Sequence, residues 1–167
     1  MNQAITAAHN SAIDVLQTAY VAALDKGDMI SWAATFATEE ANYFCISAEN
    51  DHRGLPLALM YDDCRGRIDD RVSFVTKVWA GTYQPYRTRH FIQRLSMDAA
   101  GTNQYRVTSG FTIMMSAEGD TTAVLTSGEY RDLIEIQGDG DKFRAVFRER
   151  RAVYDADVLP RYIVFPF

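Results

Sequence analysis

The sequence predicts an α+β fold in which helices come first and strands follow. Two observations support this fold class. The N-terminal half places apolar side chains at the spacing of helical turns, and the C-terminal half alternates apolar and polar side chains between tight turns. The chain has 167 residues and contains no repeat or Pro/Ser-rich linker. We therefore expect residues 1–167 to form a single domain.

Three helices are expected before residue 85. The first covers about residues 4–26, with Ile13, Leu16, Tyr20 and Leu24 on one face, and ends at Gly27. Asp28 is a good N-cap for a short second helix through about residue 36. The third begins near residues 62–63 and ends before Gly81 and Pro85. Its apolar stripe contains Cys64, Ile68, Val72, Val75 and Trp79.

Strands are expected from residue 41 onward and dominate the second half. Residues 41–48 have strand composition, and residues 49–54 read as a polar turn. Gly128 suggests a bend or bulge, and residues 138–141 are a strong turn signal. The four long strands cover residues 87–98, 104–115, 121–136 and 143–154. Strands of this length must curl, which favours an antiparallel cone around the first helix, as in cystatin-like and nuclear-transport-factor-like domains.

Composition excludes several classes of protein. The net charge of −5 argues against a nucleic-acid partner. The sequence contains no apolar run long enough to span a membrane and no secretory leader pattern, so we expect a cytoplasmic protein without a membrane partner. The two cysteines, Cys45 and Cys64, are expected to be reduced and buried.

Few residues suggest catalysis. Only His9, His52 and His90 could serve as imidazole ligands, and neither cysteine has a histidine two or three residues later. We therefore expect no metal site in this chain, and His9 is expected to be solvated. His90 is the best acid–base candidate, and the carboxylate of Asp69 and the phenol of Tyr43 are candidate partners. Tyr20 and Tyr130 could join them. The alternative is that His90 is a hydrogen-bonded histidine on a sheet next to an interface.

The C-terminal region suggests a subunit interface. Arg148, Glu149, Arg150 and Arg151 put charge on both faces of one predicted strand, and the chain then ends in an apolar run. An apolar end must dock on its own sheet or on another chain. Candidates for intersubunit contacts are Arg87, Arg89, Arg148, Arg150, Arg151, Phe165 and Phe167. The alternative for residues 148–151 is a charge ladder across strands of the same chain.

Several short pieces, in order and at matching spacing, resemble one family. They are Gly54-Leu-Pro-Leu57 with Asp62-Asp63 following, Asp70-Arg71-Val72, Arg87-Thr-Arg-His90, and the stretch from Arg148-Glu-Arg-Arg151 to Ile163-Val-Phe-Pro-Phe167. Together they resemble the small (β) subunit of Rieske-type aromatic-ring-hydroxylating oxygenases. Two further stretches, residues 61–65 and 78–81, look similar to the branch that acts on hydroxy- or amino-benzoates, such as salicylate hydroxylases and anthranilate dioxygenases.

This resemblance implies a cone-shaped subunit with no cofactor of its own. In that family a large α subunit holds a Rieske [2Fe–2S] cluster and a mononuclear iron. Electrons come from NAD(P)H through a separate reductase, and α and β subunits assemble as α3β3. The resemblance thus implies a non-catalytic β subunit of an enzyme that hydroxylates an aromatic acid. The alternatives are a stand-alone isomerase or dehydratase that uses His90, and a module that binds a small aromatic ligand.

Overall fold

The computed structural model describes residues 6–138 and 143–167, so most of the predicted turn at 138–141 lies outside the described residues. The longest helix, α1, spans Ala7–Lys26. Its N-cap is Thr6, whose side chain accepts a hydrogen bond from the His9 backbone N–H, and it ends at Gly27 with φ of 69°. Asp28 caps the short helix α2 (Met29–Ala33), as predicted.

The remaining helices differ from the predicted ones. The expected polar turn at 49–54 is mostly a short helix, α3 (Ala48–His52), because the Ser47 side chain caps it by accepting a hydrogen bond from the Asn50 backbone N–H. The predicted third helix is α4 (Arg65–Ser73), which continues into one π-helical turn, η1 (Phe74–Val78).

In the described residues, six strands form one mixed sheet in the order β2-β1-β6-β5-β4-β3. The strands are β1 (Asn42–Ser47), β2 (Ala58–Asp62), β3 (Tyr86–Gly101), β4 (Gln104–Ala117), β5 (Ala123–Gln137) and β6 (Arg144–Tyr154). All neighbours are antiparallel except β1 and β6, which are parallel, so the prediction of a purely antiparallel sheet needs this correction. Sequence reasoning missed β2, which is a five-residue edge strand that leaves Leu59 and Tyr61 exposed.

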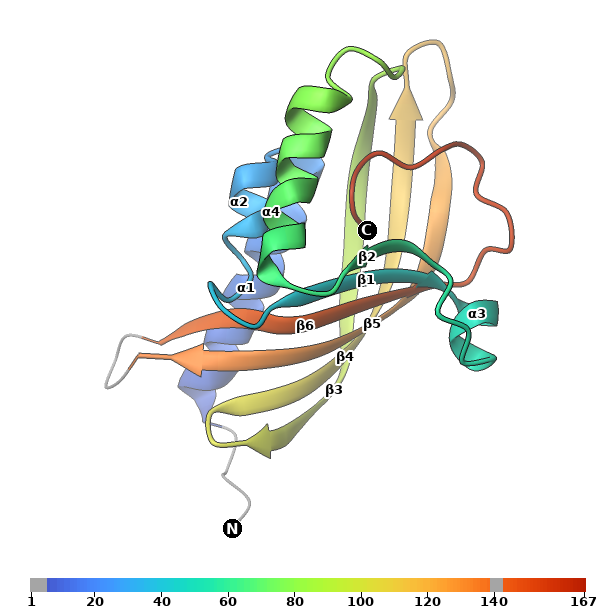
Figure 1. Cartoon of the computed structure of the whole chain (residues 1–167). Coiled ribbons are helices and arrows are strands. Elements are labelled where there is room, and N and C mark those ends of the chain that lie inside the picture. Colours follow the sequence, from blue (N-terminus) through green and yellow to red (C-terminus); the bar gives the residue numbers. More distant parts are fainter. Residues whose placement is uncertain (1–5, 139–142) are drawn as a thin grey trace.

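The long strands curl into the predicted cone. Figure 1 shows β3, β4 and β5 bending, with α1, α2 and α4 along one side and the C-terminal segment returning into the curve. Register shifts accompany the curvature in all three antiparallel pairs formed by β3 to β6. None of them lies at Gly128. That glycine instead permits close packing, since a Cβ there would lie 2.1 Å from the Val153 carbonyl oxygen.

The core lies between the helices and the concave face of the sheet. His9 belongs to it, contrary to prediction: it is buried, and its Nδ1 lies 2.6 Å from the Tyr105 hydroxyl. Both cysteines are free, but only Cys45 is buried, since Cys64 lies at the exposed start of α4. Within the described residues, each helix is too short or too polar to cross a lipid bilayer.

Candidate functional site

His90 pairs with an acid that the sequence did not single out. Its Nδ1 lies 2.6 Å from Oδ1 of Asp25, which is in the last turn of α1. The Asp25 carboxylate also accepts hydrogen bonds from the Thr88 hydroxyl (3.1 Å) and the His90 backbone N–H (3.2 Å). The His90 side chain is only 1% exposed. The contact therefore ties the end of α1 to β3, as expected for a hydrogen-bonded histidine on a sheet.

The other proposed acid–base residues do not join His90. Asp69 is exposed on α4, and its carboxylate pairs with Arg65 at 2.8 Å. The Tyr43 hydroxyl accepts a hydrogen bond from the Phe167 backbone N–H at 2.9 Å. Asp25 and His90 are 65 residues apart, and no local spacing pattern signals their contact. Only the packing of α1 against β3 creates it.

The inside of the cone is filled by the chain itself. Phe167 is 1% exposed and packs against the rings of Phe111 and Tyr154. The Tyr20 hydroxyl donates a hydrogen bond to the Phe167 main-chain oxygen. Burial raises the pKa of Tyr20 to about 12, although the Arg150 guanidinium opposes this shift. Phe167 is thus an anchor within its own chain, which corrects its assignment to a subunit interface.

Arg150 also lies in the core and not at an interface. Its guanidinium is fully buried and forms a bidentate pair with Asp132, at 2.9 Å and 2.8 Å. It lies about 4 Å from the ring centres of Tyr20, Tyr130 and Phe147. Burial alone would lower the pKa of Arg150, but the Asp132 carboxylate outweighs burial and raises it. Arg150 is therefore enclosed by its own chain, whereas the sequence placed it at a subunit interface.

A β-bulge explains the error. Ile134 of β5 faces Phe147 of β6 and Leu133 faces Glu149, so Arg148 is an extra residue in the ladder. Strict alternation would have put Arg148 and Arg150 on the same face. The bulge instead places Phe147 and Arg150 together in the core and leaves Arg148 half-buried.

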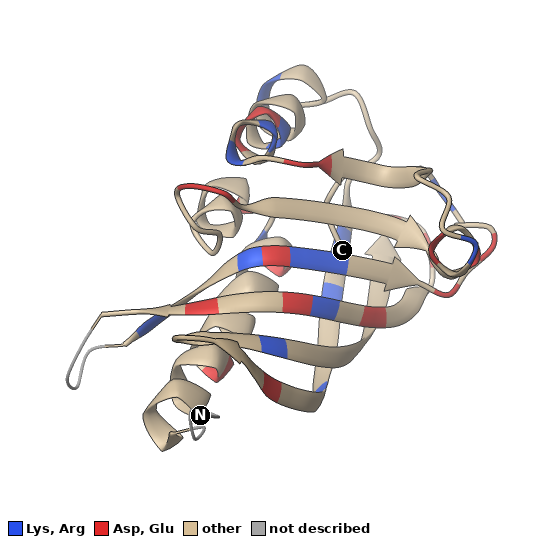
Figure 2. Cartoon of the chain, turned by 60° about the horizontal axis from the view of Figure 1, so that its bottom comes forward, with Lys and Arg blue, Asp and Glu red and all other residues tan. Residues whose placement is uncertain are grey.

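Figure 2 shows charged residues lying side by side on β5 and β6. Three arginines of these strands form ion pairs within the chain: Arg131, Arg148 and Arg151. Arg151 and Arg131 both bind the Asp51 carboxylate, at 2.7 Å and 2.6 Å. Arg148 binds Glu40 and lies 3.7 Å from Glu135. Two pairs join β5 to β6, Arg148–Glu135 and Arg150–Asp132, as the alternative of a charge ladder within one chain predicts. Whether Arg148 and Arg151 also contact a neighbouring subunit stays a prediction.

Arg87 and Arg89 have different surroundings. They are exposed on β3 and line a recess of about 390 Å³ together with Lys26, at the end of α1. Arg89 donates a hydrogen bond to the Thr88 carbonyl oxygen at 2.8 Å. Within the described part of the chain, no acidic side chain forms an ion pair with these three cations. Phe165 is half-buried and lines the same recess.

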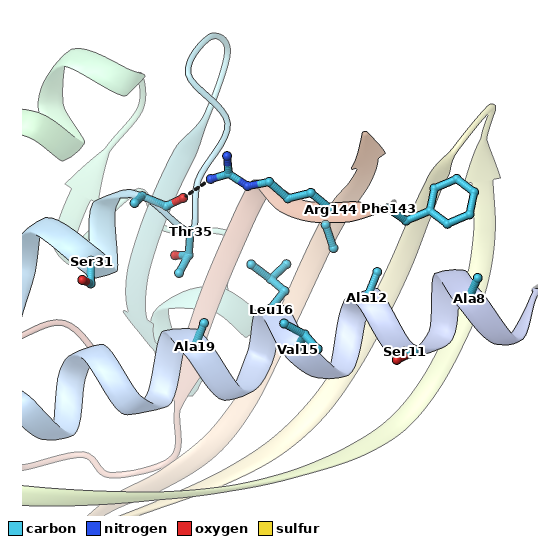
Figure 3. Close-up of a pocket in the computed structure, with 12 residues that line it drawn as sticks. Ala8, Ser11, Ala12, Val15, Leu16, Ala19, Ser31, Thr35, Phe143 and Arg144 are labelled. Atoms are coloured by element: carbon cyan, nitrogen blue, oxygen red, sulfur yellow. Dashed lines mark hydrogen bonds between the residues drawn. The ribbon is translucent and has the colours of Figure 1, made fainter. Parts of the chain in front are cut away.

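A second recess, of about 510 Å³, lies between α1, α2 and the start of β6 (Figure 3). Small and apolar side chains of α1, among them Ala12 and Val15, face Phe143 and Arg144 across it. The Arg144 guanidinium is held at one end, where it donates a hydrogen bond to the Ala34 carbonyl oxygen at 2.8 Å. This recess offers apolar contact but few polar groups.

Metal-ligating side chains do not gather in the part of the chain that the structure describes: no three His, Cys, Asp or Glu residues form a group able to hold a metal ion.

The chain was compared with known protein families and sequences. The family model described as "Ring hydroxylating beta subunit" matches residues 20–161. A relative from Comamonas sp., the terminal oxygenase component subunit beta 2 of terephthalate 1,2-dioxygenase, is 28% identical over 92% of this chain and 96% of its own length. The small subunit of anthranilate 1,2-dioxygenase from Burkholderia cepacia is 25% identical over 92% of this chain and 91% of its own.

A solved structure agrees with the sequence comparisons. The beta subunit of a putative aromatic-ring-hydroxylating dioxygenase from Novosphingobium aromaticivorans superposes with a TM-score of 0.79. It is 25% identical, and the match covers 93% of this chain and 94% of that one. The α+β cone predicted from the sequence is therefore confirmed at the level of the whole fold.

Proposed function

We propose a function for this chain from the premise that it belongs to the family of ring-hydroxylating beta subunits. It is the non-catalytic β subunit of an aromatic-ring-hydroxylating dioxygenase. Its role is to hold the large α subunits in place within an α3β3 assembly. The chemistry takes place in the α subunit, which would hold the Rieske cluster and the mononuclear iron and receive electrons from NAD(P)H through a reductase.

The observation that carries the non-catalytic role is the filled cone. An enzyme that worked inside this fold would need a cavity open to substrate. Here Phe167 occupies the concave side, and the Tyr20 and Tyr43 hydroxyls both bond to its main chain. Burying these groups stabilises the fold and leaves the outer surface free for contacts with other subunits.

The substrate class follows from the named relatives. Terephthalate and anthranilate, which appear in the names of two relatives, are both aromatic carboxylic acids. We propose that the assembled enzyme hydroxylates an aromatic acid. Because the reaction takes place in the α subunit, the side chains of this chain would affect the substrate only through the position of that subunit.

Co-expression with the α subunit tests this function. The two chains should purify together as a coloured, iron-containing complex, and aromatic-acid turnover should require both chains. This chain alone should show no turnover and no bound iron. Turnover of a substrate by the isolated chain, or its failure to bind any α subunit encoded beside it, would contradict the proposal.

The His90–Asp25 contact supports a second candidate, an acid–base isomerase or dehydratase. The contact has the donor and acceptor that such chemistry needs, but the imidazole is nearly inaccessible in this structure. The substitution His90→Gln separates the two functions. In a β subunit it should leave the kcat of the assembled oxygenase within about twofold, whereas in a stand-alone enzyme it should lower activity by about a hundredfold or more.

A further inference from the structure

The recess between the end of α1 and the start of β3 holds cations that form no ion pair within the described residues. Its lining includes Lys26, Arg87 and Arg89 as cations and Asp25 as its one carboxylate. The Asp25 carboxylate already accepts hydrogen bonds from Thr88 and the His90 backbone, and it contacts the His90 ring. The Asp25 carboxylate is therefore already bound by Thr88 and His90 of the same chain. The three cations form no ion pair with any acidic side chain of the described chain.

The recess is distinguished by holding three such cations together. On β5 and β6, Arg131, Arg148 and Arg151 each bind at least one carboxylate of the same chain. Arg87 and Arg89 point the same way because they are two residues apart on a strand. The Arg89 guanidinium is also steadied by its hydrogen bond to the Thr88 carbonyl oxygen. The recess is thus a concentrated positive site on a chain whose net charge is −5.

The wall of the recess is aromatic and fixed in place. The Tyr86 hydroxyl accepts hydrogen bonds from the backbone N–H groups of Val164 (3.2 Å) and Phe165 (3.4 Å). These bonds hold the Phe165 ring edge-on against the rings of Tyr83 and Tyr86, with centroids 6.0 Å and 5.8 Å apart. Arginine and tyrosine are the residue types enriched where protein interfaces are strongest.

We propose that this recess receives an acidic side chain, with apolar neighbours, from the large subunit of the oxygenase. This inference rests on the proposed function, since it names the place where the partner binds. The charges favour this partner, because its carboxylate would pair with cations that form no ion pair within the described residues. The aromatic wall would pack against the residues beside that carboxylate.

Carbodiimide cross-linking tests the contact directly, because the reagent joins a carboxylate to an amine only where the two touch. The chain has three lysines, Lys26, Lys77 and Lys142. In the assembled complex, mass spectrometry should find Lys26 joined to an Asp or Glu of the large subunit. The substitution Lys26→Arg keeps the positive charge but removes the amine, so it should abolish this product and leave assembly intact. A Lys26 product joined to a second copy of this chain, or no Lys26 product in a stable complex, would overturn the inference.

Charge reversal supplies an independent measurement. The double substitution Arg87→Glu/Arg89→Glu should weaken binding of the large subunit at least tenfold and flatten its salt dependence. Arg106→Glu is the matched control, because Arg106 is also exposed on the sheet but lies outside the recess. If the double reversal does not fold, Arg87→Gln/Arg89→Gln should weaken binding in the same direction. Equal affinity of the recess variants and the Arg106 control would refute the inference.

Two further measurements distinguish failure of the proposed function from failure of the docking role: binding by the wild-type chain, and titration with benzoate. If the wild-type chain binds no large subunit, the proposed function fails. If it binds and the recess variants bind equally well, only the present inference fails. Titration of benzoate into the isolated chain should give no saturable heat. Saturable benzoate binding that the double reversal abolishes would mean that the recess takes a small aromatic acid, and the docking role would then be wrong.

Discussion

Arg150 and Asp132 form a bidentate ion pair that is completely enclosed by the fold. Both side chains are 0% exposed, and the two hydrogen bonds measure 2.9 Å and 2.8 Å. The guanidinium also lies against three aromatic rings. Such a pair is costly to bury but more costly to break, because removing one partner leaves an uncompensated charge in the core.

Arg150→Ala should therefore destabilise the folded chain itself. We expect the free energy of unfolding to fall by about 3–5 kcal/mol, measured by denaturant titration of the isolated chain. Arg106→Ala, at an exposed arginine of the same sheet, should change it by less than about 0.5 kcal/mol. A loss of assembly with unchanged stability of the isolated chain would show that Arg150 acts at an interface after all.

Phe167→Ala should also act on folding before it affects assembly. The side chain is fully buried against Phe111 and Tyr154, so its removal leaves a cavity. We expect the free energy of unfolding to fall by about 3–5 kcal/mol. Phe165→Ala is the comparison, because Phe165 is only half-buried. This substitution should lower the free energy of unfolding by less than half as much. Thermal melting of the two variants measures the difference. Equal melting temperatures would mean that Phe167 is not seated in the cone in solution.

Gly128→Ala should disrupt the sheet where β5 meets β6. A methyl group there would lie 2.1 Å from the Val153 carbonyl oxygen and 2.8 Å from the Phe111 ring, so the strands would have to move apart. We expect the free energy of unfolding to fall by about 1–3 kcal/mol. Gly110→Ala is the matched control on β4, since its nearest neighbour, the Leu95 methyl carbon, is 3.9 Å away. Comparable stability of the two variants would rule out the close packing at Gly128.

Asp51 should make stability depend on pH in the acid range. Burial raises the pKa of its carboxyl, but hydrogen bonds from Arg151 and Arg131 outweigh burial and lower the pKa below its usual value. The unfolded chain then binds the proton more readily than the folded chain. The contribution of Asp51 is therefore complete above a pH of about 4 and disappears as the pH falls further.

The substitution Asp51→Asn measures this contribution. At neutral pH the variant should be less stable than the wild type by about 1 kcal/mol, because half-exposed arginines form weak pairs. The two unfolding free energies should converge as the pH falls below the ordinary carboxyl range. A difference that stays constant from neutral to acid pH would indicate that Asp51 stabilises the chain by a route other than its charge.

Local sequence signals determined most of the secondary structure. Apolar spacing and the caps at Gly27 and Asp28 located α1 and α2, and alternation with turn residues located β3 to β6. The curl of the sheet followed from strand length. The order of the short matching pieces then led to the correct family. These features depend on residues that are close in sequence, and for that reason they could be recognised in advance.

Tertiary structure decided which charges are free and which are part of the core. One bulge in β6 turned Arg150 inward, and packing across long sequence separations paired it with Asp132 and paired His90 with Asp25. The sequence could not reveal that Arg148 and Arg151 form ion pairs with carboxylates of the chain, while Arg87 and Arg89 form none within the described residues. A charge pair depends on distance in space, and that distance is set only when the strands and the long helix come together.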